Sequence, residues 1–209
     1  MPINATQFLA RLQRTQFLTP VLVFVMATLT LAFRPPVSAR MFQGSGLPAR
    51  FTATATNLDP TVQLTATLVD FNITRWSTDA ERQQLRNILV EKGQDKLLRA
   101  LQSIPRVGTM KTPDTLSYDL HYARSTREGD EDHVVLVTDR PIAMWEQANF
   151  TRTLQYPFTV IEMHIDPSGR GEGKITVATK ITVDKSGQIV LENYSSQPVR
   201  LTNVRRETH

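Results

Sequence analysis

The chain has 209 residues, a formal net charge of +4 and no cysteine. The first 39 residues hold Arg11, Arg14 and Arg34 and no acidic residue, which leaves the remainder with a net charge of +1. A chain so close to neutral lacks the clustered basic face that nucleic-acid binding needs. The absence of cysteine excludes disulfides, thiol catalysis and cysteine-bound metals.

Residues 1–39 are predicted to be a leader for export. Arg11 and Arg14 precede an uncharged run over 17–33, and Val37 and Ala39 fit the small residues that a signal peptidase reads. The leader is either a signal peptide cut after Ala39 or an uncut N-terminal anchor, because the run approaches the ~20 residues that span a bilayer. Both alternatives predict an exported protein, periplasmic or secreted, that contacts the membrane only through 17–33 if the leader stays uncut.

Residues 40–50 are predicted to be a flexible lead-in, and residues 51–206 a single β-rich globular domain. The segment 51–56 alternates with period two, as a strand does. The run 61–76 is rich in β-forming residues and changes its apolar face between its two halves, which predicts a bulge or bend.

Two helices are predicted next. Thr78 and Glu81 have the spacing of a capping box, and Gly93 is a natural end for the helix that they begin. A second helix carries Leu97 and Leu101 and stops before Pro105. We expect the two helices to form an amphipathic hairpin that covers one side of a sheet.

The rest of the chain is predicted to be strands joined by short turns, which favour antiparallel pairing. The predicted strands are 116–124, 133–138, 156–165, 174–183, 188–194 and 199–204. The strand 174–183 is expected to place Ile175, Val177, Ile181 and Val183 on one face, after a hairpin loop at 169–173. The fold class is therefore α+β, mainly antiparallel β, arranged as a sandwich or a partly open barrel with the helical hairpin on one side.

Two strands each place a carboxylate and a histidine on one face. Asp119 and His121 form one pair, and Glu162 and His164 form the other. If the strands were neighbours, the four side chains could converge on a divalent metal or an acid–base site, as in a metal-assisted hydrolase. The alternative is a solvated outer face, and no resident metal or cofactor is predicted.

Trp76 with the adjacent Arg75, and separately Trp145, are candidate ligand-binding residues. An exposed tryptophan beside a charged side chain suits a sugar or another ring-shaped ligand. Packing in the core is the alternative for both tryptophans.

Short segments along the predicted domain form a recognisable set. They are Arg75–Arg82, Thr138–Ile142, Tyr156–Glu162, Gly171–Gly173, Leu191–Tyr194 and Gln197–Val199. This set resembles a group of uncharacterised exported bacterial proteins of the acidobacterial type. The resemblance spans about Phe51 to Arg206 and implies a signal peptide and a single domain. It carries over no functional residue, because the group has no assigned activity.

The leading interpretation is a non-catalytic exported domain that binds a protein partner in the cell envelope or a small apolar ligand. No nucleotide loop and no serine-nucleophile motif occurs in the sequence. The hydrolase that uses the two carboxylate–histidine pairs is one alternative. A membrane-tethered subunit of an envelope complex, held by an uncut leader, is the other.

Overall fold

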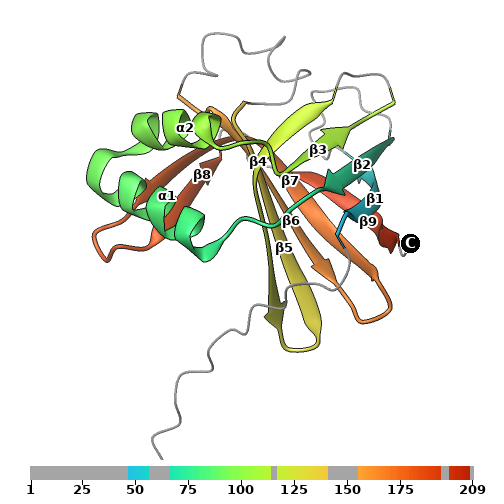
Figure 1. Cartoon of the computed structure of the whole chain (residues 1–209). Helices are drawn as coiled ribbons and strands as arrows, with labels where there is room; N and C mark the ends of the chain where they lie inside the picture. The colour runs from blue at the N-terminus through green and yellow to red at the C-terminus, as the bar shows by residue number, and fades with distance from the viewer. Residues whose placement is uncertain (1–46, 57–65, 114–116, 141–154, 194–197, 208–209) are drawn as a thin grey trace, which may run out of the picture. The chain divides into compact units, whose positions relative to one another are not determined.

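A computed structural model describes residues 47–56, 66–113, 117–140, 155–193 and 198–207 (Figure 1), which all belong to one compact unit, Ser38–His209. The leader, Trp145 and residues 61–65 lie outside the described residues. The elements in chain order are β1 (Ala49–Thr56), β2 (Thr67–Ile73), α1 (Asp79–Lys92), α2 (Gln94–Ser103), β3 (Gly108–Lys111), β4 (Tyr118–Glu128), β5 (Glu131–Thr138), β6 (Phe158–Ile165), β7 (Arg170–Val183), β8 (Ile189–Asn193) and β9 (Val199–Glu207). The bulge predicted within the run 61–76 is absent from Thr67–Ile73, which pairs with β1 in continuous register, and the apolar face does not change there because Leu68 is 62% exposed.

Eight of the strands close into an antiparallel barrel. From β1 to β6 each strand pairs with the next, β6 pairs with β7, β7 pairs with β9, and β9 returns to pair with β1. The strand β8 pairs with the end of β7 outside this ring. The prediction of a mainly antiparallel α+β fold is confirmed. The sandwich and the partly open barrel are wrong, because the β6–β7 and β7–β9 pairings leave no free edge in the ring.

Large apolar side chains fill the inside of the barrel. Phe51, Phe71, Leu120, Ile161 and Leu201 are all fully buried in one continuous cluster. An eight-stranded barrel is just wide enough for side chains to fill it. The interior of this barrel is therefore a packed core, and a binding site must be sought on its outer face or at its ends.

A bulge in β7 divides that strand between the barrel and the outer layer. Phe158 of β6 lies opposite Thr179, whereas Val160 lies opposite Thr176, so β7 holds an extra residue between these pairs. An extra residue exchanges the two faces of a strand. Ile175 therefore points into the barrel core, whereas Ile181 packs outside it. The expectation that all the apolar residues of 174–183 share one face is wrong for this reason.

The predicted helical hairpin is confirmed, and it covers the outer face of the barrel. Thr78 and Glu81 form the capping box, with the Glu81 N–H donating to Thr78 Oγ1 at 3.1 Å. Leu89 of α1 and Leu101 of α2 pack in a second apolar cluster with Phe158 of β6. This outer cluster places α1 and α2 over β4, β5, β6 and the end of β7.

The glycine-rich segment lies in a strand and not in the predicted loop. The turn spans Asp166 to Gly169, and Gly169 adopts a φ of +78° that favours glycine. Gly171 and Gly173 then lie inside β7. A β-carbon at Gly171 would overlap the carbonyl oxygen of His164 on β6, so this position requires glycine for a close approach of the two strands.

Candidate functional site

The first carboxylate–histidine pair lies near the start of β4, and each member has its own partner. Asp119 is 3.4 Å from Arg106. The Nδ1 of His121 is 2.9 Å from the carbonyl oxygen of Ile104, at the end of α2. Its Nε2 is 3.8 Å from Asp139. This histidine therefore links the helical hairpin to the barrel.

The second pair faces outward from β6, as predicted, but the structure does not bring it near the first. Glu162 binds Lys174 at 2.6 Å, and the ring of His164 stacks on that of His133 at a centroid distance of 4.6 Å. His133 lies opposite Thr126 of β4, five residues beyond His121, a separation of about 17 Å along an extended strand at ~3.4 Å per residue. The four side chains therefore do not converge. Among the described residues no three His, Asp or Glu side chains are placed to hold a metal ion.

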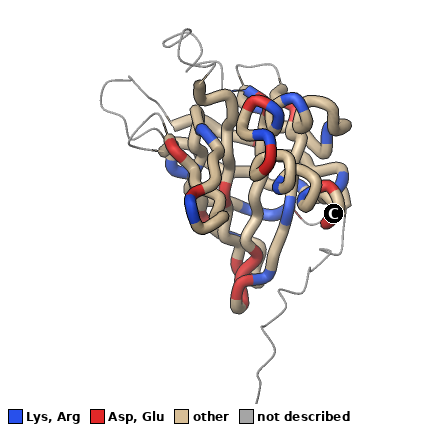
Figure 2. The backbone as a smooth tube through the Cα atoms, turned by 90° about the vertical axis from the view of Figure 1, so that its left-hand side faces the viewer, with Lys and Arg blue, Asp and Glu red and all other residues tan. Residues whose placement is uncertain are grey.

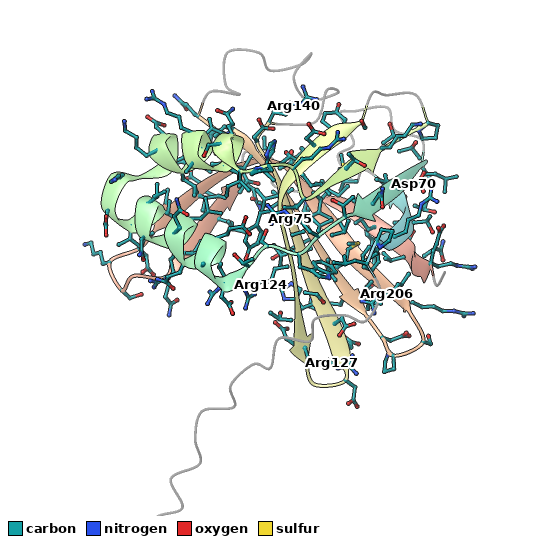
Figure 3. All side chains as sticks on the ribbon, in the orientation of Figure 1. Asp70, Arg75, Arg124, Arg127, Arg140 and Arg206 are labelled. Atoms are coloured by element: carbon teal, nitrogen blue, oxygen red, sulfur yellow. The ribbon has the colours of Figure 1, made fainter. Side chains whose placement is uncertain are left out.

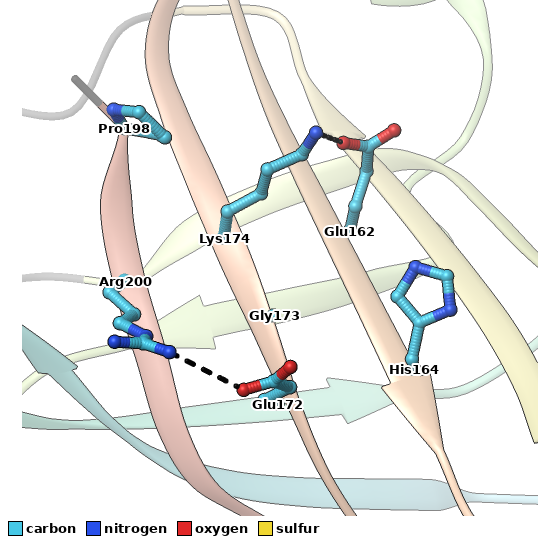
Figure 4. Close-up of a pocket in the computed structure, with 7 residues that line it drawn as sticks. All are labelled: Glu162, His164, Glu172, Gly173, Lys174, Pro198 and Arg200. Carbon is cyan, nitrogen blue, oxygen red and sulfur yellow. Dashed lines mark ion pairs between the residues drawn. The ribbon is translucent and has the colours of Figure 1, made fainter.

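Glu162 and His164 border a shallow groove of about 370 Å³ on the outer face of the barrel (Figure 4). Gly173, which has no side chain, forms part of its floor. The charged residues of the groove pair with one another: Lys174 with Glu162 at 2.6 Å and Arg200 with Glu172 at 3.7 Å. This internal balance leaves the groove without an excess charge for a ligand.

Arg75 and Trp76, which were candidate ligand-binding residues, have structural roles. Arg75 makes two hydrogen bonds to the carboxylate of Glu81, at 2.9 and 3.0 Å, and so joins the end of β2 to the first turn of α1. Trp76 packs against the barrel core, and its buried indole N–H has no acceptor among the described residues. Trp145 lies outside the described residues.

A larger cavity, of about 440 Å³, lies between the helical hairpin and the outer face of the barrel. Its apolar lining comes from both helices and from five strands. These residues are Leu85, Leu89, Leu97, Leu101, Tyr122, Val135, Val137, Phe158, Val160, Ile181, Ile189 and Leu191. Its polar lining is confined to Arg82, Arg86, Arg124, Thr126 and Glu162. We call this space the helix–barrel cavity.

The strand register gives the barrel wall of the cavity a polarity gradient. One row across the sheet holds Tyr122, Val137 and Val160. The next row, two residues further along β4, holds Arg124, Val135 and Glu162. The third row holds Thr126, which still lines the cavity, and His133 and His164, which lie beyond its lining. The wall therefore changes from apolar to charged to polar along the strands.

Three of the residues that line the helix–barrel cavity are arginines, and two of them, Arg82 and Arg124, share Asp79 as an ion-pair partner. Arg82 and Arg86 are one helical turn apart on α1, so they lie on the same face of that helix. Arg124 of β4 lies beside the start of α1 (Figure 3) and donates to Asp79 at 2.9 Å. Only 16% of its side chain is exposed. Over much of the described backbone seen from the helix side, basic and acidic positions are interspersed, and acidic positions gather at the lower tip (Figure 2).

Tyr122, which also lines the cavity, supplies a hydroxyl group. Burial raises the pKa of Tyr122, and the neighbouring Arg124 lowers it by a smaller amount. The hydroxyl group therefore remains protonated at neutral pH and can donate a hydrogen bond.

The leucine spacing predicted the apolar face of the helices, but no local pattern predicted the cavity beneath it. Leu97 and Leu101 were expected to pack on the sheet, and they do. The i, i+4 spacing of Arg82 and Arg86 was the one local signal of a basic edge beside that face. The contribution of Arg124 depends on how β4 lies against α1, which no local pattern specifies.

Comparisons with protein-family models, curated proteins and solved structures found no match. The described part of the chain contains no helix long and apolar enough to cross a membrane.

Proposed function

We propose that this protein is a non-catalytic binding module of the cell envelope that holds a small, largely apolar molecule in the helix–barrel cavity. The observation that carries the proposal is the cavity itself, with a volume of about 440 Å³ and a lining of mostly aliphatic and aromatic side chains. Binding sites for small molecules typically measure about 300–1,000 Å³ and are mostly apolar with a few polar groups.

The packing around the cavity supports an occupant. Leu85, Leu89 and Leu101 are each less than a tenth exposed and belong to the outer apolar cluster, and all three also line the cavity. A ligand that covers apolar surface gains about 25 cal/mol per Å² removed from water. The concave shape favours a small molecule over a protein partner, which the sequence alone left equally open.

The envelope location in this proposal rests on the predicted leader. An exported domain without cysteine needs a core large enough for stability without disulfides, and the packed barrel supplies one independently of the helix–barrel cavity. The barrel can therefore support a binding layer on its outer face.

The proposal can be tested with N-phenyl-1-naphthylamine, a neutral apolar dye that fluoresces when it leaves water. We expect saturable binding to the native protein. The variant Val137→Phe places an aromatic ring in the cavity and should weaken dye binding at least tenfold. The matched control is Val90→Phe, because Val90 is 50% exposed on α1 and does not line the cavity. Absence of dye binding, or an equal loss in both variants, would refute the proposed function.

A further inference from the structure

We infer that the ligand of the helix–barrel cavity is a single-chain amphiphile with an anionic head group, such as a medium-chain carboxylate. Its chain would lie among the leucines, and its head group would lie between Arg82, Arg86 and Arg124. This inference rests on the proposed function and adds the chemical class of the ligand.

The charged side chains at the cavity give the first support. Three arginines and one glutamate line it. The glutamate, Glu162, is neutralised by Lys174 at 2.6 Å. Asp79 is shared between Arg124 at 2.9 Å and Arg82 at 3.9 Å. The Asp79 carboxylate is therefore shared by two guanidinium groups. Among the described contacts, the third guanidinium group, that of Arg86, makes one hydrogen bond, to the carbonyl oxygen of Gly187 at 3.4 Å, and no ion pair.

The hydrogen-bonding capacity of these arginines gives the second support. A guanidinium group has five N–H donors, in a planar arrangement that matches a carboxylate. Arg124 is mostly shielded from water, with 16% of its side chain exposed, and its Nη1 already donates to Asp79. Charge-assisted hydrogen bonds to its remaining donors are stronger in such a setting than in open solvent.

The separation of polar and apolar lining gives the third support. The row of Tyr122, Val137 and Val160 is continuous with Phe158, Leu97 and Leu101 in the outer cluster. The row of Arg124 and Glu162 begins one step along the strands. A molecule that matches this wall has one apolar end and one polar end, and the excess arginine charge specifies an anion.

The volume limits the length of the chain. A cavity of about 440 Å³ holds on the order of 15 non-hydrogen atoms, if each atom takes the ~30 Å³ that one water molecule occupies in the liquid. A saturated carboxylate of about twelve carbons has this size. A two-chain lipid exceeds it, so free amphiphiles and membrane lipids can be distinguished by experiment.

The first experiment compares three probes by displacement of N-phenyl-1-naphthylamine from the native protein. Dodecanoate, dodecanol and dodecyltrimethylammonium share one chain length and carry negative, zero and positive charge, and each is used as monomers. We expect dodecanoate to displace the dye best and dodecyltrimethylammonium least, with the dodecanoate affinity falling as salt increases. The two-chain anion is tested without the dye, by flotation of the protein with phosphatidylglycerol vesicles, and the protein should not float with them.

The second experiment uses matched arginine variants. Arg86→Gln should weaken dodecanoate binding about 3- to 5-fold, the effect of losing a partly exposed charge contact, and should leave dodecanol unchanged. Arg99→Gln removes an exposed arginine of α2 outside the cavity and should change neither affinity. Circular dichroism would check that each variant keeps the native fold.

The outcomes separate the two proposals. Equal displacement by dodecanoate and dodecanol, preference for the cation, or flotation of the protein with the vesicles would overturn the anionic amphiphile and leave the apolar cavity function standing. If N-phenyl-1-naphthylamine itself does not bind, the proposed function fails, and this inference fails with it.

Discussion

Among the ionisable residues of the described barrel, we predict that Asp132 contributes most to the free energy of unfolding. Its side chain is 8% exposed and accepts hydrogen bonds at 2.8 Å from both Arg127 of β4 and Arg206 of β9. Figure 3 labels the two arginines. The guanidinium of Arg206 also lies 5.4 Å from the ring centre of Phe51. This network joins the β4–β5 hairpin to the last strand of the barrel.

The variant Asp132→Asn keeps the shape of the side chain and removes its charge, leaving two arginines without their shared partner. Removing one member of a buried ion pair costs about 3–5 kcal/mol. The arginine side chains here are 37% and 29% exposed, so solvent screening reduces the expected loss to about 2–3 kcal/mol. The matched control is Asp130→Asn in the exposed turn, which should change stability by less than about 0.5 kcal/mol.

The same network predicts a pH dependence. Burial alone would raise the pKa of Asp132, but the hydrogen bonds and charges of Arg127 and Arg206 together outweigh burial and hold the pKa below its ordinary value. A carboxyl group with a lowered folded-state pKa stabilises the protein above its unfolded pKa of ~3.9 and loses that contribution as the pH falls through the folded value. The difference in the free energy of unfolding between the native protein and Asp132→Asn should therefore be largest at pH 7 and should shrink below about pH 4.

Urea unfolding followed by circular dichroism at pH 7 and at pH 3 would measure both effects. An Asp132→Asn variant within about 0.5 kcal/mol of the native protein at pH 7, or a difference that grows as the pH falls, would refute the assigned role of the network.

Two further predictions concern positions where the local geometry is demanding. Thr78→Ala removes the capping hydrogen bond to the Glu81 N–H at 3.1 Å and should lower the free energy of unfolding by about 1 kcal/mol, measured by urea titration; no change would mean that Arg75 and Glu81 hold the helix start alone. Gly171→Ala should cost about 1–3 kcal/mol in the same assay, as overpacking does, because the added carbon overlaps His164 backbone. A Gly171→Ala protein with native stability would show that β6 and β7 can separate there without cost.

The features that sequence patterns predicted well are those fixed by near neighbours in the chain. The start of α1 was predictable because Thr78 and Glu81 complete their hydrogen bonds within one helical turn. The outward direction of Glu162 and His164 was predictable because Ile161 and Met163 alternate with them. Neither pattern contains information on which strand lies alongside.

The features that were missed depend on pairing between distant segments. Closure of the barrel requires β1 to meet β9, about 150 residues later, with Thr54 opposite Thr202. The change of face in β7 depends on its register with β6, since only the opposition of Thr176 and Val160 reveals the extra residue. The convergence of Asp119, His121, Glu162 and His164 was conditional on neighbouring strands, and that condition is not met, because β5 lies between β4 and β6 and the two pairs stand in different rows of the sheet.

The helical hairpin is inserted between β2 and β3, which are neighbours in the ring. The closed barrel therefore needs neither helix for its own strand pairing, and the leucines of the hairpin contact only the outer cluster. The barrel core and the outer cluster are thus separate sets of side chains. An engineer could exchange residues 79–103 for another amphipathic hairpin and so change one wall of the cavity, while the interior of the barrel keeps its packing.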